Sequence, residues 1–189
     1  MPITAEEVLD FWFNHASHWF IANADFDAKI RTQFGQAATN AANGNFDTWT
    51  STPSGWLALL ILLDQFPRNL HRGSAHAWAQ DDKAQRVALS GIDRNEDQKL
   101  PVLHRAFAYL PLEHAEDSAL QRRSVALFEA LCGVAPADER ETFENYLDYA
   151  RRHRDVIERF GRFPHRNAAL GRVSTNEEAT YLAQPGAGF

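Results

Sequence analysis

The 189-residue chain contains only one cysteine, Cys132, so an internal disulfide is impossible. Disulfide-stabilised folds are therefore excluded, and a reducing cytoplasm is the expected location. Long apolar runs are also missing: the longest covers the eight residues 56–63, whereas a membrane-spanning helix needs about 20. The segment after Met1 has neither the basic nor the apolar part of a signal peptide, so we expect no such leader and no membrane partner.

An excess of positive charge is absent as well. The formal net charge is −6, which argues against nucleic acid as a partner. The chain has no glycine-rich phosphate loop, Ser54 lacks the flanking pattern of a nucleophile elbow, and the histidines have no spacing typical of metal ligands. We therefore expect neither a cofactor nor a metal ion.

Helical periodicity is present along most of the chain, and no segment alternates as a strand does. A capping box of Thr4 and Glu7 predicts the first helix, Thr52 and Pro53 begin a central helix, and Gly161 ends a long one. We predict an all-α protein, a single domain of residues 1–189 with about eight helices packed as antiparallel hairpins. The other helices are expected at about 25–42, between 73 and 91, at 101–111, around 125–133, from 136 to 161 and from 175 onward.

The stretch 56–72, WLALLILLDQFPRNLHR, is the centre of this prediction. A helix that is apolar on all sides is buried, so this one carries the polar residues at its end into the interior. Asp64 lies in the last turn, where the helix dipole disfavours an anion, and it needs a cationic partner such as Arg68 or an arginine from 151–166. An ion pair that fixes the helix end and a catalytic carboxylate both agree with this pattern.

Pro67 follows soon after the apolar run. The residue before a proline is disfavoured in the helical region, so we expect the helix to end at Phe66. Asp64 and Arg68 would then not be ordinary i,i+4 neighbours. The segment 65–69 resembles 162–167, because both place Phe-Pro ahead of Arg and Asn. We predict two similar corners after helix ends, lining one cavity.

Charge is distributed unevenly in the second half. The segment 151–172 has seven arginines against two acids, whereas 113–148 has nine acids against three arginines. Helical spacing places His153 and Arg154 at the apolar stripe of the long helix and leaves Arg152 and Arg159 in solvent. A buried arginine needs an anion, either an acid of the protein or a ligand.

A further acidic group follows Pro111. Glu113 and Asp117 are four residues apart and would share one helix face, as paired acid/base carboxylates do. Acids that complement the dipole in a first helical turn are the alternative.

Several motifs extend over nearly the whole chain: VLDFWF at 8–13, LDQFPRN at 63–69, YLPLEH at 109–114, QRRS at 121–124, and the segment 149–167. In these motifs the chain resembles the bacterial family known as domain of unknown function 924. The resemblance implies an all-helical fold similar to tetratricopeptide-repeat superhelices. It implies no reaction and no catalytic residues.

Three functions are compatible with these patterns. The first is binding of an anionic small molecule or a peptide carboxylate in an Arg/His-lined groove. The second is an enzyme that uses Asp/Glu–His acid/base pairs, such as Asp64 with His153 or His165, or Glu113 with His114. The third is a scaffold that binds a protein on an apolar patch. The candidate ligand-binding residues are Asp64, Arg68, Asn69, Glu113, His114, His153, Arg154, His165, Arg166 and Asn167.

Overall fold

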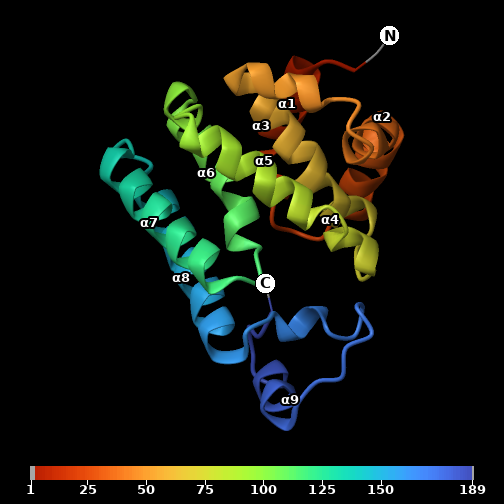
Figure 1. Cartoon of the computed structure of the whole chain (residues 1–189), viewed down its shortest axis with the longest axis vertical. Coiled ribbons are helices and arrows are strands. Elements are labelled where there is room, and N and C mark those ends of the chain that lie inside the picture. The colour runs from red at the N-terminus through yellow and green to blue at the C-terminus, as the bar shows by residue number, and fades with distance from the viewer. Residues whose placement is uncertain (1–2, 189) are drawn as a thin grey trace. The chain divides into compact units, whose positions relative to one another are not determined.

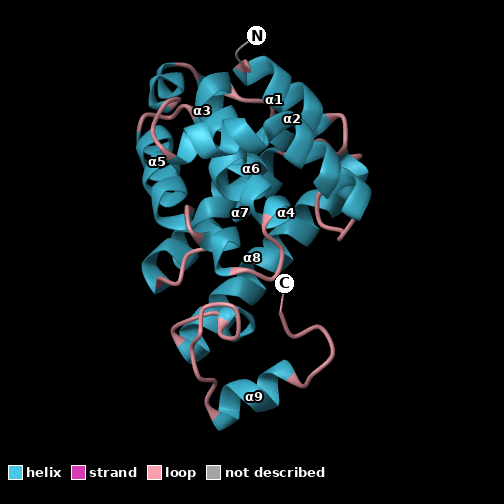
Figure 2. Cartoon of the chain, turned by 90° about the vertical axis from the view of Figure 1, so that its right-hand side faces the viewer, coloured by secondary structure: helices cyan, strands magenta, loops and turns pink. Residues whose placement is uncertain are grey.

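A computed structural model describes residues 3–188, and helices joined by short connections form this part of the chain (Figure 1). Figure 2 shows only helices and loops, and none of the residues 3–188 lies in a strand. The all-α prediction is confirmed. Met1 and Pro2, on which the expectation about a signal peptide partly depends, lie outside the described residues, as does Phe189. No helix within 3–188 has both the length and the apolar character needed to cross a bilayer.

The chain contains two compact units. Unit 1 consists of Met1–Arg72 and His76–Pro111, and unit 2 of Gly73–Ala75 and Leu112–Phe189. The single domain and the finer likeness to tetratricopeptide superhelices stay predictions.

The helices of unit 1 begin where the capping residues predict. Thr4 Oγ1 accepts the Glu7 N–H at 3.2 Å, and Glu7 Oε2 accepts the Thr4 N–H at 2.8 Å. Thr52 caps the central helix, with Pro53 in its first turn. The α-helices are α1 (Ala5–Phe13), α2 (Ala24–Ala42), α3 (Pro53–Leu60), α4 (Phe66–Leu70), α5 (Asp81–Asp93) and α6 (Val102–Glu113), whose last two residues, Leu112 and Glu113, belong to unit 2. Short 3-10 helices occupy Ala16–His18, Asp47–Ser51, Ala75–Trp78 and Asp97–Lys99.

The core of unit 1 surrounds α3, whose apolar residues are buried on every side. Trp56 donates its indole N–H to the Val87 carbonyl at 2.8 Å. Gly91 permits this contact, because a Cβ atom there would clash with the Trp56 ring. α5 ends at Asp93, near Gly91 as predicted, and the glycine lies within the helix, where it permits close packing.

The prediction that Pro67 ends the central helix is wrong. Phe66 is helical (φ −61°, ψ −38°) and donates its N–H to the carbonyl of Ile61, five residues back. Residues Ile61–Gln65 thus form a π-helical turn that joins α3 to α4. The wider turn accommodates the proline ring, which in a regular α-helix would clash with the carbonyl four residues earlier. Asp64 and Arg68 are consequently i,i+4 neighbours, and this corner lies within a helix rather than after its end.

Unit 2 contains an antiparallel hairpin of α7 (Ser118–Val134) and α8 (Arg140–Phe160), which run side by side in Figure 1. Near the turn, Cys132 Sγ donates to the Phe143 carbonyl at 3.2 Å, and further along Arg151 binds Glu129 at 2.8 Å. Gly161, at φ +69°, ends α8 as predicted. α9 (Asn176–Leu182) begins with a capping box of Thr175 and Glu178.

Two predicted boundaries in unit 2 need correction. α7 includes Gly133 and ends at Val134, and α8 begins at Arg140, because Pro136 lies in a turn before it. The second corner follows α8 as a 3-10 helix, Pro164–Arg166.

Candidate functional site

The predicted corner in unit 1 is an ion-pair network. Asp64 is only 1% exposed, and its Oδ1 lies 3.1 Å from Arg68 NH1. Arg68 also reaches Asp81 at 3.1 Å. Burial lowers the pKa of Arg68, but the charges of Asp64 and Asp81 outweigh it and raise that pKa above its ordinary value. Arg68 is thus the cationic partner that Asp64 requires, as the structural interpretation of this carboxylate expects.

Asn69 belongs to a second polar group of unit 1. It donates to Asp27 Oδ1 at 2.8 Å, and Arg72 binds both oxygens of the same carboxylate at 2.6 and 2.9 Å. Burial raises the pKa of Asp27, but its hydrogen bonds from Arg72 and Asn69 produce a net decrease. Asp27 does not stand out in the sequence, because an acid in a first helical turn is usually a surface residue that complements the dipole.

In unit 2 the buried pair is Glu113 with His153, 4% and 5% exposed. The Nδ1 atom of His153 lies 3.1 Å from Glu113 Oε1 and 2.8 Å from the Tyr149 carbonyl oxygen. Both neighbours are acceptors, so the proton of a neutral ring resides on Nδ1 and the lone pair on Nε2. Glu113 thus contacts His153, which is forty residues away in the chain, and not only residues adjacent to it in the sequence.

The predicted carboxylate pair of Glu113 and Asp117 is wrong. Glu113 is the last residue of α6, whereas Asp117 is the N-cap of α7 and accepts two backbone N–H groups at 2.8 Å. The chain turns between them, so four residues of separation do not place them on one helix face.

Two histidines and an arginine lie against the ring of Phe163, and a third histidine, His114, lies beside one of them. The ring centroids of His153 and His165 lie 5.5 and 5.6 Å from that of Phe163, and His114 lies 6.2 Å from His153. The guanidinium of Arg166 lies 4.6 Å from the Phe163 centroid and donates to the His114 carbonyl at 3.0 Å. We call these residues the Phe163 cluster: Glu113, His114, His153, Phe163, His165 and Arg166.

Burial and positive charge keep two of these imidazoles neutral. The pKa of His153 lies well below its ordinary range, because burial and then the charges of His114, His165 and Arg166 disfavour a further proton. The pKa of His165 falls to about 4, again through burial first and then the charge of Arg166, with Glu116 acting in the opposite direction.

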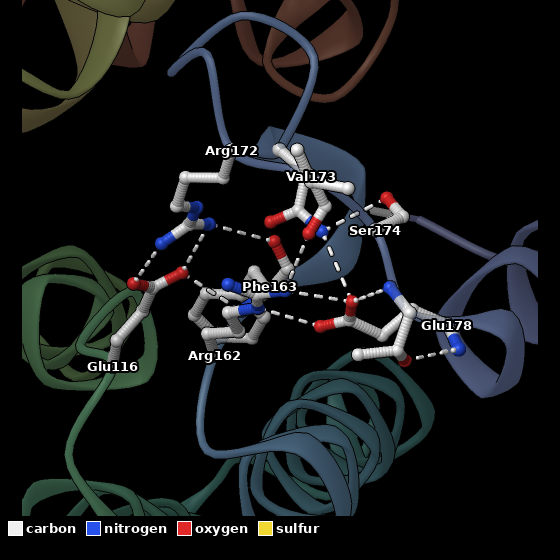
Figure 3. A network of polar contacts seen from close by, with 9 residues as sticks. Glu116, Arg162, Phe163, Arg172, Val173, Ser174 and Glu178 are labelled. Atoms are coloured by element: carbon white, nitrogen blue, oxygen red, sulfur yellow. Dashed lines mark hydrogen bonds and ion pairs between the residues drawn. The ribbon is translucent and has the colours of Figure 1, made fainter.

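Two carboxylates hold the loop that carries this cluster (Figure 3). Glu116 accepts the Phe163 N–H at 2.7 Å and binds both terminal nitrogens of Arg172 at 2.6 and 2.9 Å. Arg162 binds both oxygens of Glu178 at 2.6 and 2.8 Å. The loop is thereby fixed at both ends, which positions His165 and Arg166.

The sequence does not single out the four charged residues of this loop as site residues: Glu116, Arg162, Arg172 and Glu178. The uneven distribution of acids and arginines was the available signal, and Glu116 with Arg172 joins the two blocks. Hydrogen bonds from Arg162 and the Thr175 N–H lower the pKa of Glu178 to about 2. The pKa of Glu116 is also lowered, because the bonds from Arg172 and Phe163 outweigh the effect of burial.

The other predicted residues of unit 2 lie among internal partners. Arg154 is partly buried as predicted, and it binds Asp155 at 2.7 Å and reaches Glu158 at 4.0 Å. Asn167 is 1% exposed and donates to Ser174 Oγ at 3.0 Å. The anion that Arg154 needs is thus supplied by acids of the protein itself. Within residues 3–188, no group of three or more His, Cys, Asp or Glu side chains is arranged to hold a metal ion.

Comparison with known proteins identifies the family. The model of a family described as bacterial protein of unknown function (DUF924) matches residues 8–186. A solved structure of a protein of unknown function from Agrobacterium tumefaciens is 42% identical, with a TM-score of 0.86 over 95% of this chain and 96% of the other. A comparison with curated proteins gave no match. The chain therefore belongs to the DUF924 family of bacterial proteins of unknown function.

Proposed function

We propose that unit 2 binds a small anionic molecule, most simply a carboxylate, at the Phe163 cluster. The observation that supports this most directly is the packing of one guanidinium and two imidazoles, those of His153 and His165, around a single buried ring, with His114 beside His153. Arg166 is 6% exposed, and its contacts with the His114 carbonyl and the Phe163 face orient its planar donors. A pre-oriented guanidinium is the side chain best suited to bidentate carboxylate recognition.

The histidines contribute through their charge state. His153 and His165 are kept neutral by burial and by the charge of Arg166, so a bound anion would offset the effect of Arg166 on these rings. The anion would then raise the pKa of His165 toward its ordinary value and gain an N–H donor from it. Binding should consequently take up protons at mildly acidic pH and strengthen as pH falls.

Calorimetric titration of the whole protein with acetate and phosphate tests this proposal. Arg166→Gln should weaken binding at least tenfold, whereas the control Arg154→Gln, which alters a surface ion pair, should leave the affinity within twofold. Circular dichroism checks that both variants fold. Equal affinities of the wild type and a folded Arg166→Gln protein would contradict the assignment.

Acid/base chemistry is a second candidate, and the Glu113–His153 geometry favours it. A carboxylate at Nδ1 leaves Nε2 as the proton acceptor, the arrangement that general bases use. If the protein turns over an ester or amide of its anionic ligand, Glu113→Gln and His153→Gln should each lower the rate at least about 100-fold. Full turnover in both variants would exclude this role.

We also propose that the protein acts in the cytoplasm. The free Cys132 agrees with a reducing compartment. For a protein-binding scaffold the support is weaker. The most exposed large apolar side chains occur in separate segments of the chain, including Phe20, Val134 and Val173.

A further inference from the structure

A surface cavity of about 210 Å³ lies in unit 2, between α8, α9 and the segment 184–187 that follows α9. Arg152, Asp155 and Val156 line it on α8, and Tyr181 lines it on α9. The residues that line it all lie outside the Phe163 cluster. The cavity is therefore a second place in unit 2 where a small molecule can bind.

Part of the lining is apolar. Val156 is only 7% exposed and belongs to the buried apolar core of this region, against which Tyr181 packs. Pro185 adds apolar surface from the segment after α9. A cavity of about 150 Å³ holds benzene, so the larger volume here suits a molecule of about nine non-hydrogen atoms with an apolar portion.

The lining also carries two opposite charges side by side. Arg152 and Asp155 are three residues apart on α8, so their side chains emerge from the same face of the helix. Asp155 is bound by Arg154, but both of these bonds end on Oδ1, at 2.7 and 3.0 Å. Its second carboxylate oxygen can therefore accept a hydrogen bond from a cationic ligand group.

Arg152 is positioned to receive an anion. Its guanidinium lies 4.9 Å from the ring centroid of Tyr149, and its NH2 donates to the Gly186 carbonyl at 3.4 Å. That bond is longer than the usual range for N–H···O contacts. A carboxylate forms a shorter and stronger bond with a guanidinium than a neutral carbonyl does, so a ligand carboxylate would gain by replacing this contact.

We propose that this cavity binds a free α-amino acid with an aliphatic side chain of about the size of leucine. Its carboxylate would bind Arg152, its ammonium group Asp155, and its side chain the apolar part of the lining. An α-amino acid carries both charges on one carbon, which matches a guanidinium and a carboxylate one helical turn apart. A simple carboxylate would leave Asp155 facing an anion, and a simple amine would leave Arg152 facing a cation. The inference does not depend on the proposed anion site.

The test compares leucine with two analogues that each lack one charge. 4-Methylpentanoate has no ammonium group, and 3-methylbutylamine has no carboxylate. In NMR titrations of the whole protein, leucine should bind about fivefold more tightly than either analogue, as one exposed ion pair contributes. The largest changes in amide chemical shift should occur at Tyr181 and Ala187, which line the cavity.

Two variants separate the two charges. Arg152→Gln should weaken the binding of leucine and 4-methylpentanoate about fivefold and leave that of 3-methylbutylamine within twofold. The amine thus reports whether the variant keeps the shape of the cavity. Asp155→Asn should instead weaken leucine and 3-methylbutylamine. Arg151→Gln is the matched control, since it alters an exposed pair with Glu129 on the same helix, and it should keep all three affinities within twofold.

Three results would overturn the proposal. The first is a leucine affinity no higher than that of both analogues. The second is a leucine affinity that Arg152→Gln and Asp155→Asn leave unchanged. The third is a set of shift changes centred on His114 and Arg166, because leucine would then bind through its carboxylate at the Phe163 cluster, and the proposed function would stand without this second site.

Discussion

The Nδ1 atom of His153 is shared between the Glu113 carboxylate, at 3.1 Å, and the Tyr149 carbonyl, at 2.8 Å. The second contact comes from one helical turn earlier in α8 and the first from the end of α6. The ring is consequently oriented by two acceptors, and Nε2 is the only ring nitrogen that can accept a proton or a hydrogen bond. The contact with Glu113 and the contact with Tyr149 thus determine which nitrogen of His153 is available to a ligand.

Replacing Glu113 by Gln should reveal how much this contact stabilises the fold. The amide keeps the shape but weakens the charge-assisted bond to His153, so we expect a loss of about 1–3 kcal/mol in the free energy of unfolding. Urea denaturation measures it. Glu129→Gln, which alters the exposed pair with Arg151, should change stability by less than about 0.5 kcal/mol. Equal losses in the two variants would contradict a special role for the buried pair.

The histidines predict how stability depends on pH. The pKa of His165 is about 4 in the folded protein, against an ordinary value of 6.5, so the unfolded chain binds more protons between these values. Stability should therefore fall as pH decreases from 6.5 toward 4. His165 is partly exposed, so we expect it to contribute about 2 kcal/mol rather than the full shift. His165→Gln should flatten the profile in this window, and an unchanged profile would refute the assignment.

The loop in Figure 3 should depend on its two-bond acid–arginine pairs more than on single surface ion pairs. Arg172→Ala removes the bonds to Glu116 and to the Phe163 carbonyl, and should cost about 2 kcal/mol. It should also speed amide hydrogen exchange at Phe163, whose N–H binds Glu116. Arg159→Ala, which breaks an exposed pair with Glu177, is the control and should cost less than about 0.5 kcal/mol.

Close packing at Gly91 gives a prediction for unit 1. Gly91→Ala places a methyl group against the Trp56 ring, so we expect a destabilisation of about 1–3 kcal/mol from overpacking. Gly35→Ala, within α2 and with no neighbouring atom in reach of a new Cβ, should instead stabilise the protein by about 0.5–1 kcal/mol. Thermal unfolding of both variants checks the sign of each change. A stabilising Gly91→Ala would contradict the packing described here.

The sequence predicted local features well and long-range ones less well. The capping box at Thr4 and the helix-ending glycine at Gly161 depend on neighbouring residues only, and both are confirmed. Pro67 was misinterpreted, because a π-helical turn depends on how the surrounding core packs and has no simple local pattern.

The candidate site shows the same division. Glu113, His153 and Arg166 could be selected, since each is a polar residue beside apolar helix positions. The partner of each one could not be selected, because Glu113 and His153 are forty residues apart in the chain and nothing local specifies the pairing. Gln121 stands out only as part of a motif, and its hydrogen bonds to the Glu113 and Ala115 carbonyls appear only in three dimensions.

The most direct test of anion binding follows the imidazole signals of His165 by NMR across pH, with and without saturating acetate. The account predicts a pKa of about 4 in the free protein, and an increase of at least one unit when acetate is bound. Arg154→Gln should show the same increase, and Arg166→Gln should not respond to acetate. A His165 pKa that acetate leaves unchanged in the wild type would contradict the proposed site.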